Sequence, residues 1–354
     1  MTAVAAPLAG GRAQRLALAA ERFGWVAVGL SGLLLSFVTI STIVVFVPVG
    51  RAFADWLTYV HAVDRVLAGL PIYAPEQLAG QYVLVNVTLF GYAYPPSSVP
   101  LFIPFASYPV GLVAWLTANV GLLITGVVAI LKRERGEVRP LELAGALLLL
   151  AFFPGFADGV AFGNASVGLA GVLAWTWVIG RGHLPVGALS GLGATIKLVP
   201  GALIFWATPR TFPRTVLMAA ASAGVLFVVT LPLVGLGSWA DYVKALSLSE
   251  PACGVDVPVS LACVLKPIVG VGPAKLAGIL VALAAGIGAV VVRPSLVSFG
   301  LVVVAWLAPV TDLHFHYLLV VYVLAVVAGA RWLERWSVRG ASAGDPSAAN
   351  VRRS

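Results

Sequence analysis

The segment from residue 51 to residue 75, RAFADWLTYVHAVDRVLAGLPIYAP, carries two acids, two arginines and a histidine directly after a long apolar run. An acid at a membrane surface, close to cations, is suited to general-base work on a hydroxyl group. Asp55 and Tyr59 are four residues apart, so on a helix they lie on one flank and can face a cavity. The commoner explanation of such an acid is a solvated surface, which we expect for Asp64 beside Arg65.

Lys197 is a second candidate, because it stands inside the apolar run LSGLGATIKLVPGALIFWA. An ammonium group in hydrocarbon is costly unless it has a partner or a water-filled cavity. Pro200 would break a helix here, as in the discontinuous helices that expose backbone groups to a ligand, and a phosphate is a natural partner for the cation. A helical hairpin with Lys197 snorkelling from its tip explains the sequence equally well.

The segment TDLHFHY places Asp312, His314 and His316 at the start of the last apolar run. Residues two apart do not share a helix face, and His61 is the only further histidine expected on the same side of the membrane, so we expect no metal site. One interpretation is a histidine that donates to a phosphate or to a leaving oxygen. The alternative is a polar cap on a membrane span.

Cys253 and Cys263 lie in one polar stretch between two apolar runs. Two cysteines cannot form a disulfide framework, and their spacing is not that of zinc ligands. Outside the cytoplasm their separation allows one disulfide, which would hold the loop over a cavity. Two unrelated buried cysteines are the alternative.

The elements that must position these residues are membrane spans. Of the 354 residues, 60% are hydrophobic and 10% are charged, and the mean hydropathy is +1.00, far from the balance of a soluble domain. Residues 25–48 carry no charge and are long enough to cross a bilayer, so we expect a retained first span rather than a signal peptide. The net charge of +8 lies in short clusters between apolar runs, which indicates topology rather than nucleic-acid binding.

The basic clusters, placed in the cytoplasm by the positive-inside rule, divide the chain into about ten membrane segments. After the first span, the paired runs are 140–155 with 163–180, 184–196 with 199–209, 215–237 with 274–292, and 295–310 with 314–331. Residues 97–131 are too long for one straight span, and Pro100, Pro104 and Pro109 favour a re-entrant or interfacial start. The polar candidates then all fall on the extracytoplasmic side, where they can share one cavity.

The fold class that follows is an all-α polytopic membrane protein. Its expected parts are a cytoplasmic N-terminus (1–24), a membrane domain (25–331) with extracytoplasmic loops at about 49–96 and 238–273, and a disordered cytoplasmic tail (332–354). In the first loop, apolar residues with helical spacing predict an interfacial helix that lays one side on the membrane. That side is formed by Trp56, Val60, Val63, Leu67 and Leu70.

Six motifs, taken in order, resemble glycosyltransferase family 87. They are DWLTY, GLPIYAP, YAYPP, GNAS, GATIKLVP and PVTDLH, and they run from about residue 51 to about residue 325. Members of this family are polytopic enzymes of the GT-C superfamily that use polyprenyl-phosphate sugars, notably the polyprenol-phosphate-mannose-dependent α-mannosyltransferases of actinobacteria. The resemblance implies a GT-C-type bundle in a bacterial cytoplasmic (inner) membrane, with its active site on the extracytoplasmic side.

Carried over by position, the resemblance implies that Asp55 is the general base and that Lys197 and His314 lie near the donor phosphate. Further candidates for substrate binding are Tyr59, Arg65, Tyr94, Asn164 and His316. The chain departs from the family pattern where Asn164 replaces a usual glutamine, where PVSL replaces an asparagine-glutamine-serine run, and where PVTDLH lacks a serine-tryptophan pair. These departures bear on the acceptor and the sugar.

The predicted function is transfer of a hexose, most simply mannose, from a polyprenyl phosphate to a hydroxyl of an extracytoplasmic or lipid-linked glycan. We expect inversion at the anomeric carbon and no metal or other cofactor. The expected partners are the donor, a glycan or glycolipid acceptor and the bilayer, without nucleic acid. Arabinofuranosyl transfer from a polyprenyl-phosphate pentose is the nearest alternative, and a lipid or solute transporter is the rival from another class.

Overall fold

The structure is a computed structural model, and it describes residues 6–46, 52–80, 91–248, 260–311 and 313–344. Within these ranges every regular element is a helix, so the predicted all-α class is confirmed. Five helices are long and apolar enough to cross a membrane, and a bent helix pair would make a sixth. The chain is therefore a multi-pass membrane protein, while the expected ten segments remain a prediction.

The five candidate spans share length and high hydropathy. They are α1 (Ala6–Phe46), α5 (Val110–Arg135), α10 (Phe212–Val234), α13 (Val271–Val291) and α15 (Leu319–Gly344) with the preceding 3-10 turn η4 (Phe315–Leu318). The bent pair consists of α6 (Pro140–Ala151) and α7 (Pro154–Phe162), whose axes differ by 65°. Several of these helices begin at a proline in their first turn, where the missing N–H costs nothing.

Three further apolar helices are shorter, namely α8 (Ser166–Ile179), α9 (Leu184–Ile196) and α14 (Leu296–Leu307). At 1.5 Å per residue they cover about 18–21 Å, against about 30 Å of hydrocarbon. One end of such a helix can therefore lie inside the molecule instead of at its surface. The polar residues described below lie at such ends, namely at the start of α8 and at the end of α9.

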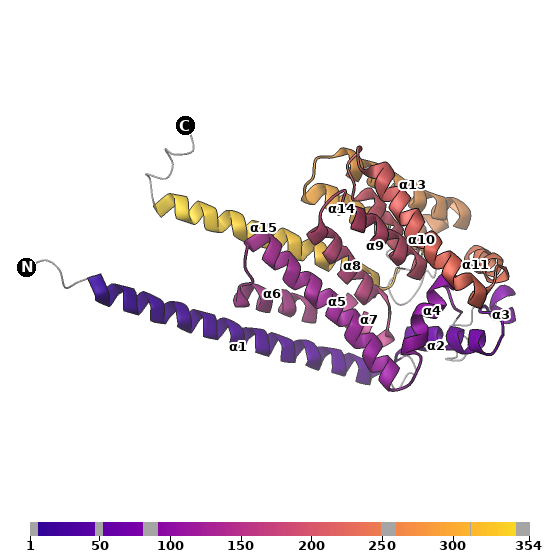
Figure 1. The fold of residues 1–354 in the computed structure, drawn as a ribbon, viewed down its shortest axis with the longest axis horizontal. Coiled ribbons are helices and arrows are strands. Elements are labelled where there is room, and N and C mark those ends of the chain that lie inside the picture. The colour runs from indigo at the N-terminus through magenta and orange to yellow at the C-terminus, as the bar shows by residue number, and fades with distance from the viewer. Residues whose placement is uncertain (1–5, 47–51, 81–90, 249–259, 312, 345–354) are drawn as a thin grey trace, which may run out of the picture.

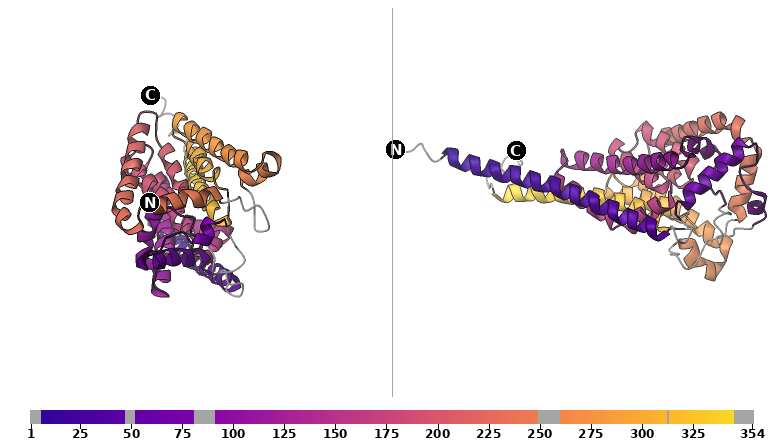
Figure 2. Two further views of the ribbon diagram at one scale, coloured as in Figure 1. Left: turned by 90° about the vertical axis from the view of Figure 1, so that its right-hand side faces the viewer. Right: turned by 90° about the horizontal axis from the view of Figure 1, so that it is seen from below.

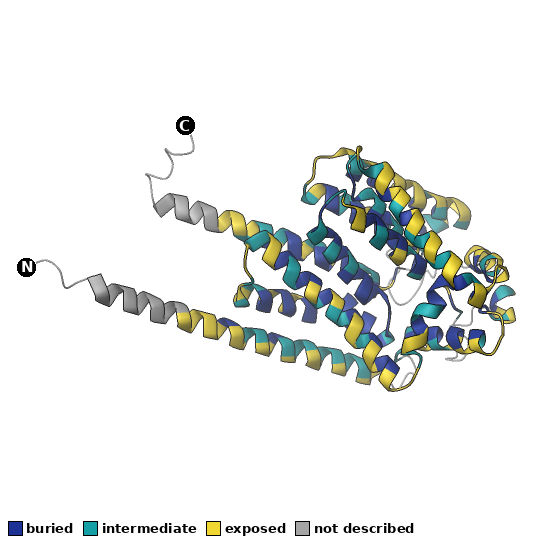
Figure 3. Ribbon diagram, in the orientation of Figure 1, coloured by how far each residue is buried: buried dark blue, intermediate teal, exposed yellow. Residues whose placement is uncertain are grey.

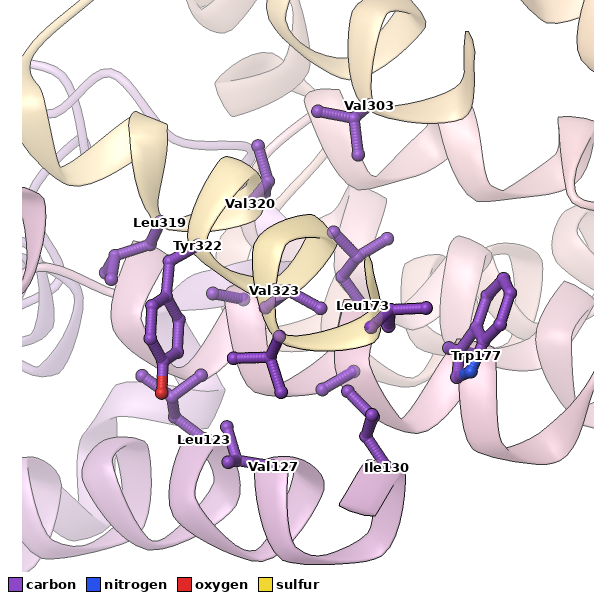
Figure 4. Packing of buried hydrophobic residues seen from close by; sticks show 14 of the residues in the cluster. Leu123, Val127, Ile130, Leu173, Trp177, Val303, Leu319, Val320, Tyr322 and Val323 are labelled. Carbon is purple, nitrogen blue, oxygen red and sulfur yellow. The ribbon is translucent and has the colours of Figure 1, made fainter. Parts of the chain in front are cut away.

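The core lies between α5, α8 and α15. Figure 4 shows Leu123 and Ile130 of α5 packed toward Leu173 of α8 and Val323 of α15. Helices α5 and α8 approach closely because a side chain at Gly171 would meet the backbone of Leu122 at 2.7 Å. In a bilayer such packing stabilises mainly through van der Waals contacts, because lipid tails are as apolar as leucine.

The short elements gather at one end of the molecule (Figure 1). They are α2 (Ala54–Leu67), α3 (Pro75–Leu78), η1 (Pro96–Ser98), α4 (Val99–Phe102), η2 (Ile103–Phe105) and α11 (Gly237–Leu248), with α12 (Leu261–Val269) following later in the chain. The expected loops at 49–96 and 238–273 thus contain helices. At the other end, α1 and α15 project beyond the remaining helices, as Figure 1 and the right-hand view of Figure 2 show.

One sequence expectation about helix limits is confirmed, and one needs revision. The stretch 97–131 consists of short helical turns up to Phe105 and one long helix, α5, so the prolines do interrupt it as predicted. The C-terminal tail, expected to be disordered from residue 332, is helical to Gly344 because α15 continues past its apolar part. Helix α1 likewise begins at Ala6, inside the expected N-terminal segment.

The helix predicted in the first loop exists as α2, but its faces differ from the prediction. Val63 is buried in the protein core, whereas Leu67 and Leu70 are exposed. The two leucines lie at and beyond the end of the helix. Figure 3 shows buried and exposed residues side by side at this end of the molecule. Contact of α2 with a membrane surface stays a prediction, while its other face clearly packs on the protein.

Candidate active site

The polar cluster is built around Asn164, which follows Gly163 in the turn between α7 and α8. Gly163 has φ 66°, a left-handed conformation that ends α7 and that a glycine adopts without strain. Asn164 is 3% exposed, and its Oδ1 accepts hydrogen bonds from the backbone N–H of Ser166 (2.8 Å) and from Nζ of Lys197 (3.0 Å). Its Nδ2 donates to Oδ2 of Asp55. One side-chain amide therefore links an acid and a cation.

Lys197 is placed by the end of α9. The helix stops at Ile196, Lys197 has extended backbone angles, and the chain then turns back along α9 as the 3-10 helix η3 (Val199–Phe205). The hydroxyl of Ser190 donates hydrogen bonds to the carbonyl oxygens of Pro200 and Gly201, and these bonds hold the two helical arms of the hairpin together. The predicted break is thus present, and it is the tip of a hairpin.

The Lys197 side chain nevertheless does not snorkel, since it is only 7% exposed. Besides Asn164, its Nζ donates to Oγ of Ser166 at 3.0 Å. The same atom lies 4.3 Å from the centre of the Tyr317 ring and 5.3 Å from that of Tyr94, as in a cation–π contact. Oxygen acceptors and aromatic faces together replace the hydration that burial removes.

Asp55 reaches the cluster because the first turn of α2 docks on the α7–α8 turn. The backbone N–H of Phe53 donates to Ala161 at 2.6 Å, and a side chain at Gly163 would lie 2.7 Å from Cβ of Trp56. Trp56 also donates through Nε1 to the carbonyl of Phe105 at 3.0 Å. These contacts on both sides fix the position of Asp55, which is itself half-buried.

Tyr59 and Tyr94 form the aromatic side of the cluster. The hydroxyl of Tyr59 donates to that of Tyr94 at 3.0 Å and accepts the backbone N–H of Ala165 at 3.2 Å. Burial, followed by the negative charge of Asp55, raises the pKa of Tyr59 well above its ordinary value. Burial and the neighbouring Tyr59 and Asp55 raise the pKa of Tyr94 in the same way. Both phenols are therefore neutral hydrogen-bonding groups at physiological pH.

The two histidines occupy different environments. His316 is 4% exposed, and its Nδ1 lies 2.8 Å from Oδ2 of Asp158 on α7. His314 is exposed, and its ring stacks on that of His316 with 5.4 Å between centroids. We expected the two histidines on different faces of a helix, but the backbone at His314 is extended and lies outside any helix.

Several predicted residues lie apart from this cluster or outside the described residues. Arg65, a candidate for substrate binding, donates through Nε to the carbonyl of Pro71 at 2.7 Å and so closes the end of α2. Asp64 is exposed, as expected of a solvated face. Cys263 is disulfide-bonded, but its predicted partner Cys253 lies outside the described residues. Arg51 and Asp312 lie outside them as well.

Three residues of the cluster were not singled out from the sequence. Ser166 is part of the motif GNAS and Tyr317 ends the segment TDLHFHY, while Asp158 lies six residues before Asn164 and outside those motifs. The signal for Asp158 was present, because an acid between two apolar runs needs a partner. Nothing in the sequence indicated that this partner is His316.

A shallow hollow of about 620 Å³ opens elsewhere, on the outer face of α5. Its described lining is apolar and consists of Pro109, Val110, Val113, Ala114, Thr117 and Ala118. None of the cluster residues contributes to it. The chemistry of the side chains, and not the size of this hollow, therefore identifies the candidate active site.

The cluster combines what an acid-base transfer reaction at an anionic group requires. A carboxylate can take a proton, a buried ammonium can hold a negative charge, and Asn164 keeps both in fixed positions. Within the described residues, no three potential metal ligands converge on one point.

Comparison with known proteins gives one match. The model of glycosyltransferase family 87 matches residues 92–349, which includes Asn164, Lys197 and both histidines but begins after Asp55. No curated protein and no solved structure matches the chain. The matched region is well over half of the chain and contains all the candidate spans except α1. The chain belongs to glycosyltransferase family 87 and is a membrane glycosyltransferase.

Proposed function

We propose that the protein transfers a hexose, most simply mannose, from a polyprenyl phosphate to a hydroxyl group of an extracytoplasmic or lipid-linked glycan. The observation that carries this proposal is the link from Asp55 through Asn164 to the buried Lys197. It supplies a base for the acceptor and a cation for the phosphate within one small site.

The architecture favours a lipid-borne donor. Lys197 directly follows α9, a helix that is shorter than a bilayer, and α9 packs against the candidate membrane span α10. A polyprenyl chain can stay in lipid while its phosphate reaches this ammonium. Asn164, Ser166 and the rings of Tyr94 and Tyr317 hold the cation in place before the anion arrives.

In the proposed reaction, the bond between the anomeric carbon and the phosphate oxygen breaks, and its electron pair leaves with the phosphate. Lys197 offsets the charge that develops on that oxygen, with a histidine from the start of the last span, His314 by family position, as a second donor. The acceptor oxygen attacks from the opposite face, and its proton passes to Asp55. The anomeric carbon is therefore inverted, and no step requires a metal.

The donor sugar distinguishes two versions of this proposal. Mannose follows from the resemblance of six motifs, and arabinofuranose is the alternative because related members of the family use a polyprenyl-phosphate pentose as donor. Both versions place the site on the extracytoplasmic side of a bacterial inner membrane. A transporter could also use a buried lysine in a broken helix, but it has no need of the acid that Asn164 holds.

The test is transfer of label from radiolabelled polyprenyl-phosphate mannose by membranes that contain the protein, with the arabinofuranose donor in parallel. Asp55→Asn should lower kcat by about 100-fold or more, because it removes the base and keeps the shape. Asp64→Asn is the matched control, since Asp64 is an exposed acid on the same helix. Unchanged turnover in Asp55→Asn would remove Asp55 from the mechanism.

A further inference from the structure

The pair of Asp158 and His316 has no place in the mechanism so far, although it lies beside the site. Oδ2 of Asp158 accepts two hydrogen bonds from His316, one from the ring nitrogen Nδ1 at 2.8 Å and one from the backbone N–H at 3.2 Å. The Asp158 side chain is 17% exposed and that of His316 is 5% exposed. Two bonds to one oxygen fix both the backbone and the ring.

The contact with Asp158 determines how the imidazole is presented. A carboxylate accepts hydrogen bonds, so Nδ1 carries a proton, and Nε2 lies across the ring from Asp158. The rings of His316 and Tyr317 have centroids 4.9 Å apart, and Tyr317 in turn covers Lys197. His316 is therefore a neighbour of the proposed phosphate position.

The packing around His316 shows that this position is built into the fold. A side chain at Gly159 would lie 3.2 Å from Cβ of His316, and one at Gly155 would lie 2.3 Å from the carbonyl oxygen of Phe315. Helix α7 thus approaches η4 closely enough to bring Asp158 to the imidazole. His314, by contrast, is exposed and its backbone is extended.

We propose that His316, positioned by Asp158, is the histidine that contacts the donor phosphate, and that His314 does not fill that role. This inference rests on the proposed function. Nδ1–H donates to Asp158, and a phosphate anion that binds beside Nε2 favours uptake of a second proton from water, so that Nε2–H donates to a phosphate oxygen. As the bond to the anomeric carbon breaks, the electron pair stays on the phosphate, and the proton remains on Nε2. Asp158 is a positioning residue that balances the charge of the ring.

The test uses two amides that each imitate one ring nitrogen. His316→Asn places its amide near Nδ1 and keeps the bond to Asp158, whereas His316→Gln places its amide near Nε2 and loses that bond. The proposal predicts that His316→Asn keeps the wild-type melting temperature but loses about 10- to 100-fold in kcat, with the donor KM less affected. His316→Gln should retain more turnover than His316→Asn.

A purely structural role for the pair predicts the reverse order, with His316→Asn near wild type and His316→Gln impaired. That order, or a greater loss in His314→Asn than in His316→Asn, would overturn the inference. Asp158→Asn gives an independent measurement, because its amide oxygen can still accept from Nδ1 but carries no charge. We expect it to lower kcat at unchanged melting temperature, and unchanged kcat would count equally against the proposal.

The control is His183→Asn, an exposed histidine at the other end of the bundle before α9. It should leave both kcat and melting temperature as in the wild type. The failure of this inference can be told from the failure of the proposed function. If the wild type transfers neither sugar from a polyprenyl phosphate, both proposals fall. If it transfers sugar and His316→Asn equals wild type, only the role of His316 falls.

Discussion

Basic residues, an acid and aromatic rings gather around each end of α8, but they are paired differently at the two ends. At the C-terminal end, Arg133 donates to the carbonyls of Trp177 (2.5 Å) and Val178. Oε1 of Glu134 accepts from Nε1 of Trp177 at 2.8 Å, and Oε2 lies 3.1 Å from Nε of Arg331. We call Arg133, Glu134, Trp177 and Arg331 the clamp cluster. Its opposite charges touch directly and its arginine satisfies the helix-end carbonyls.

At the N-terminal end of α8, the acid and the cation are joined through a neutral amide. Asp55 and Lys197 bind opposite ends of the Asn164 side chain. In the clamp cluster a carboxylate and an arginine lie in direct contact, whereas Asn164 holds Asp55 and Lys197 apart by one hydrogen bond to each. The partners of a charged residue, more than its type or burial, thus separate a structural cluster from a candidate active site.

The largest effects should come from replacing one charged residue near each end of α8 by a neutral residue. Lys197→Met should lower kcat by about 100-fold or more, because the developing phosphate charge loses its cation. Its stability should stay the same or rise, since an apolar side chain of similar volume needs no buried partner. Glu134→Gln should do the opposite, with unchanged kcat and a loss of about 1–3 kcal/mol in the free energy of unfolding.

Turnover and thermal melting in detergent, measured on both variants, test whether the two substitutions have these opposite effects on kcat and on stability. If Lys197→Met lowers the melting temperature as much as Glu134→Gln does, the lysine is a structural charge like those of the clamp cluster. A fall in kcat for Glu134→Gln would show that the two ends are coupled through α8.

The helices around both ends of α8 could be predicted from the sequence, but only some of the contacts between their charged residues could. Apolar runs and first-turn prolines give α6, α8, α9 and α14 nearly at their observed limits, because these signals are local. Lys197 was equally detectable, since a lysine in an apolar run requires a partner. Its partners come from α8 and from the start of the last span, and no local pattern encodes such contacts.

The histidines show the same limit. The spacing of His314 and His316 was interpreted as that of a helix, but residues 313–314 form no helix and the rings stack. The acid that orients His316 lies on α7, far away in sequence. Likewise, Arg65 seemed close to Asp55 along the chain, but the length of α2 carries it to the other end of that helix.

A smaller effect is expected when the neutral linker at each end is removed. Asn164→Ala should lower kcat by about tenfold, because Asp55 and Lys197 lose their common support but remain present. In a Lys197→Met background the same change should cost less, since one of its two partners is already gone. Equal losses in the two backgrounds would show that Asn164 acts independently of Lys197.

Trp177→Phe is the counterpart at the clamp cluster. It removes the N–H that Glu134 accepts and should lower the free energy of unfolding by about 1 kcal/mol without changing kcat. Denaturation of the purified protein and label transfer by the same sample test both parts. A kcat that falls for Trp177→Phe as much as for Asn164→Ala would remove the contrast between the two ends.

The smallest effect is expected at Tyr59, a neutral residue of the candidate active site. Tyr59→Phe leaves the backbone N–H of Ala165 without its acceptor, so we expect a loss of about 1 kcal/mol in stability and only a few-fold loss in kcat. The raised pKa makes a second, sharper prediction. Because the folded protein keeps this phenol protonated while the unfolded chain ionises near pH 10, its contribution to stability is complete below about pH 10 and declines above it. The difference in melting temperature between wild type and Tyr59→Phe should therefore be smaller at about pH 10.5 than at about pH 8. A difference that is the same at both pH values would mean that Tyr59 ionises as easily as an exposed tyrosine.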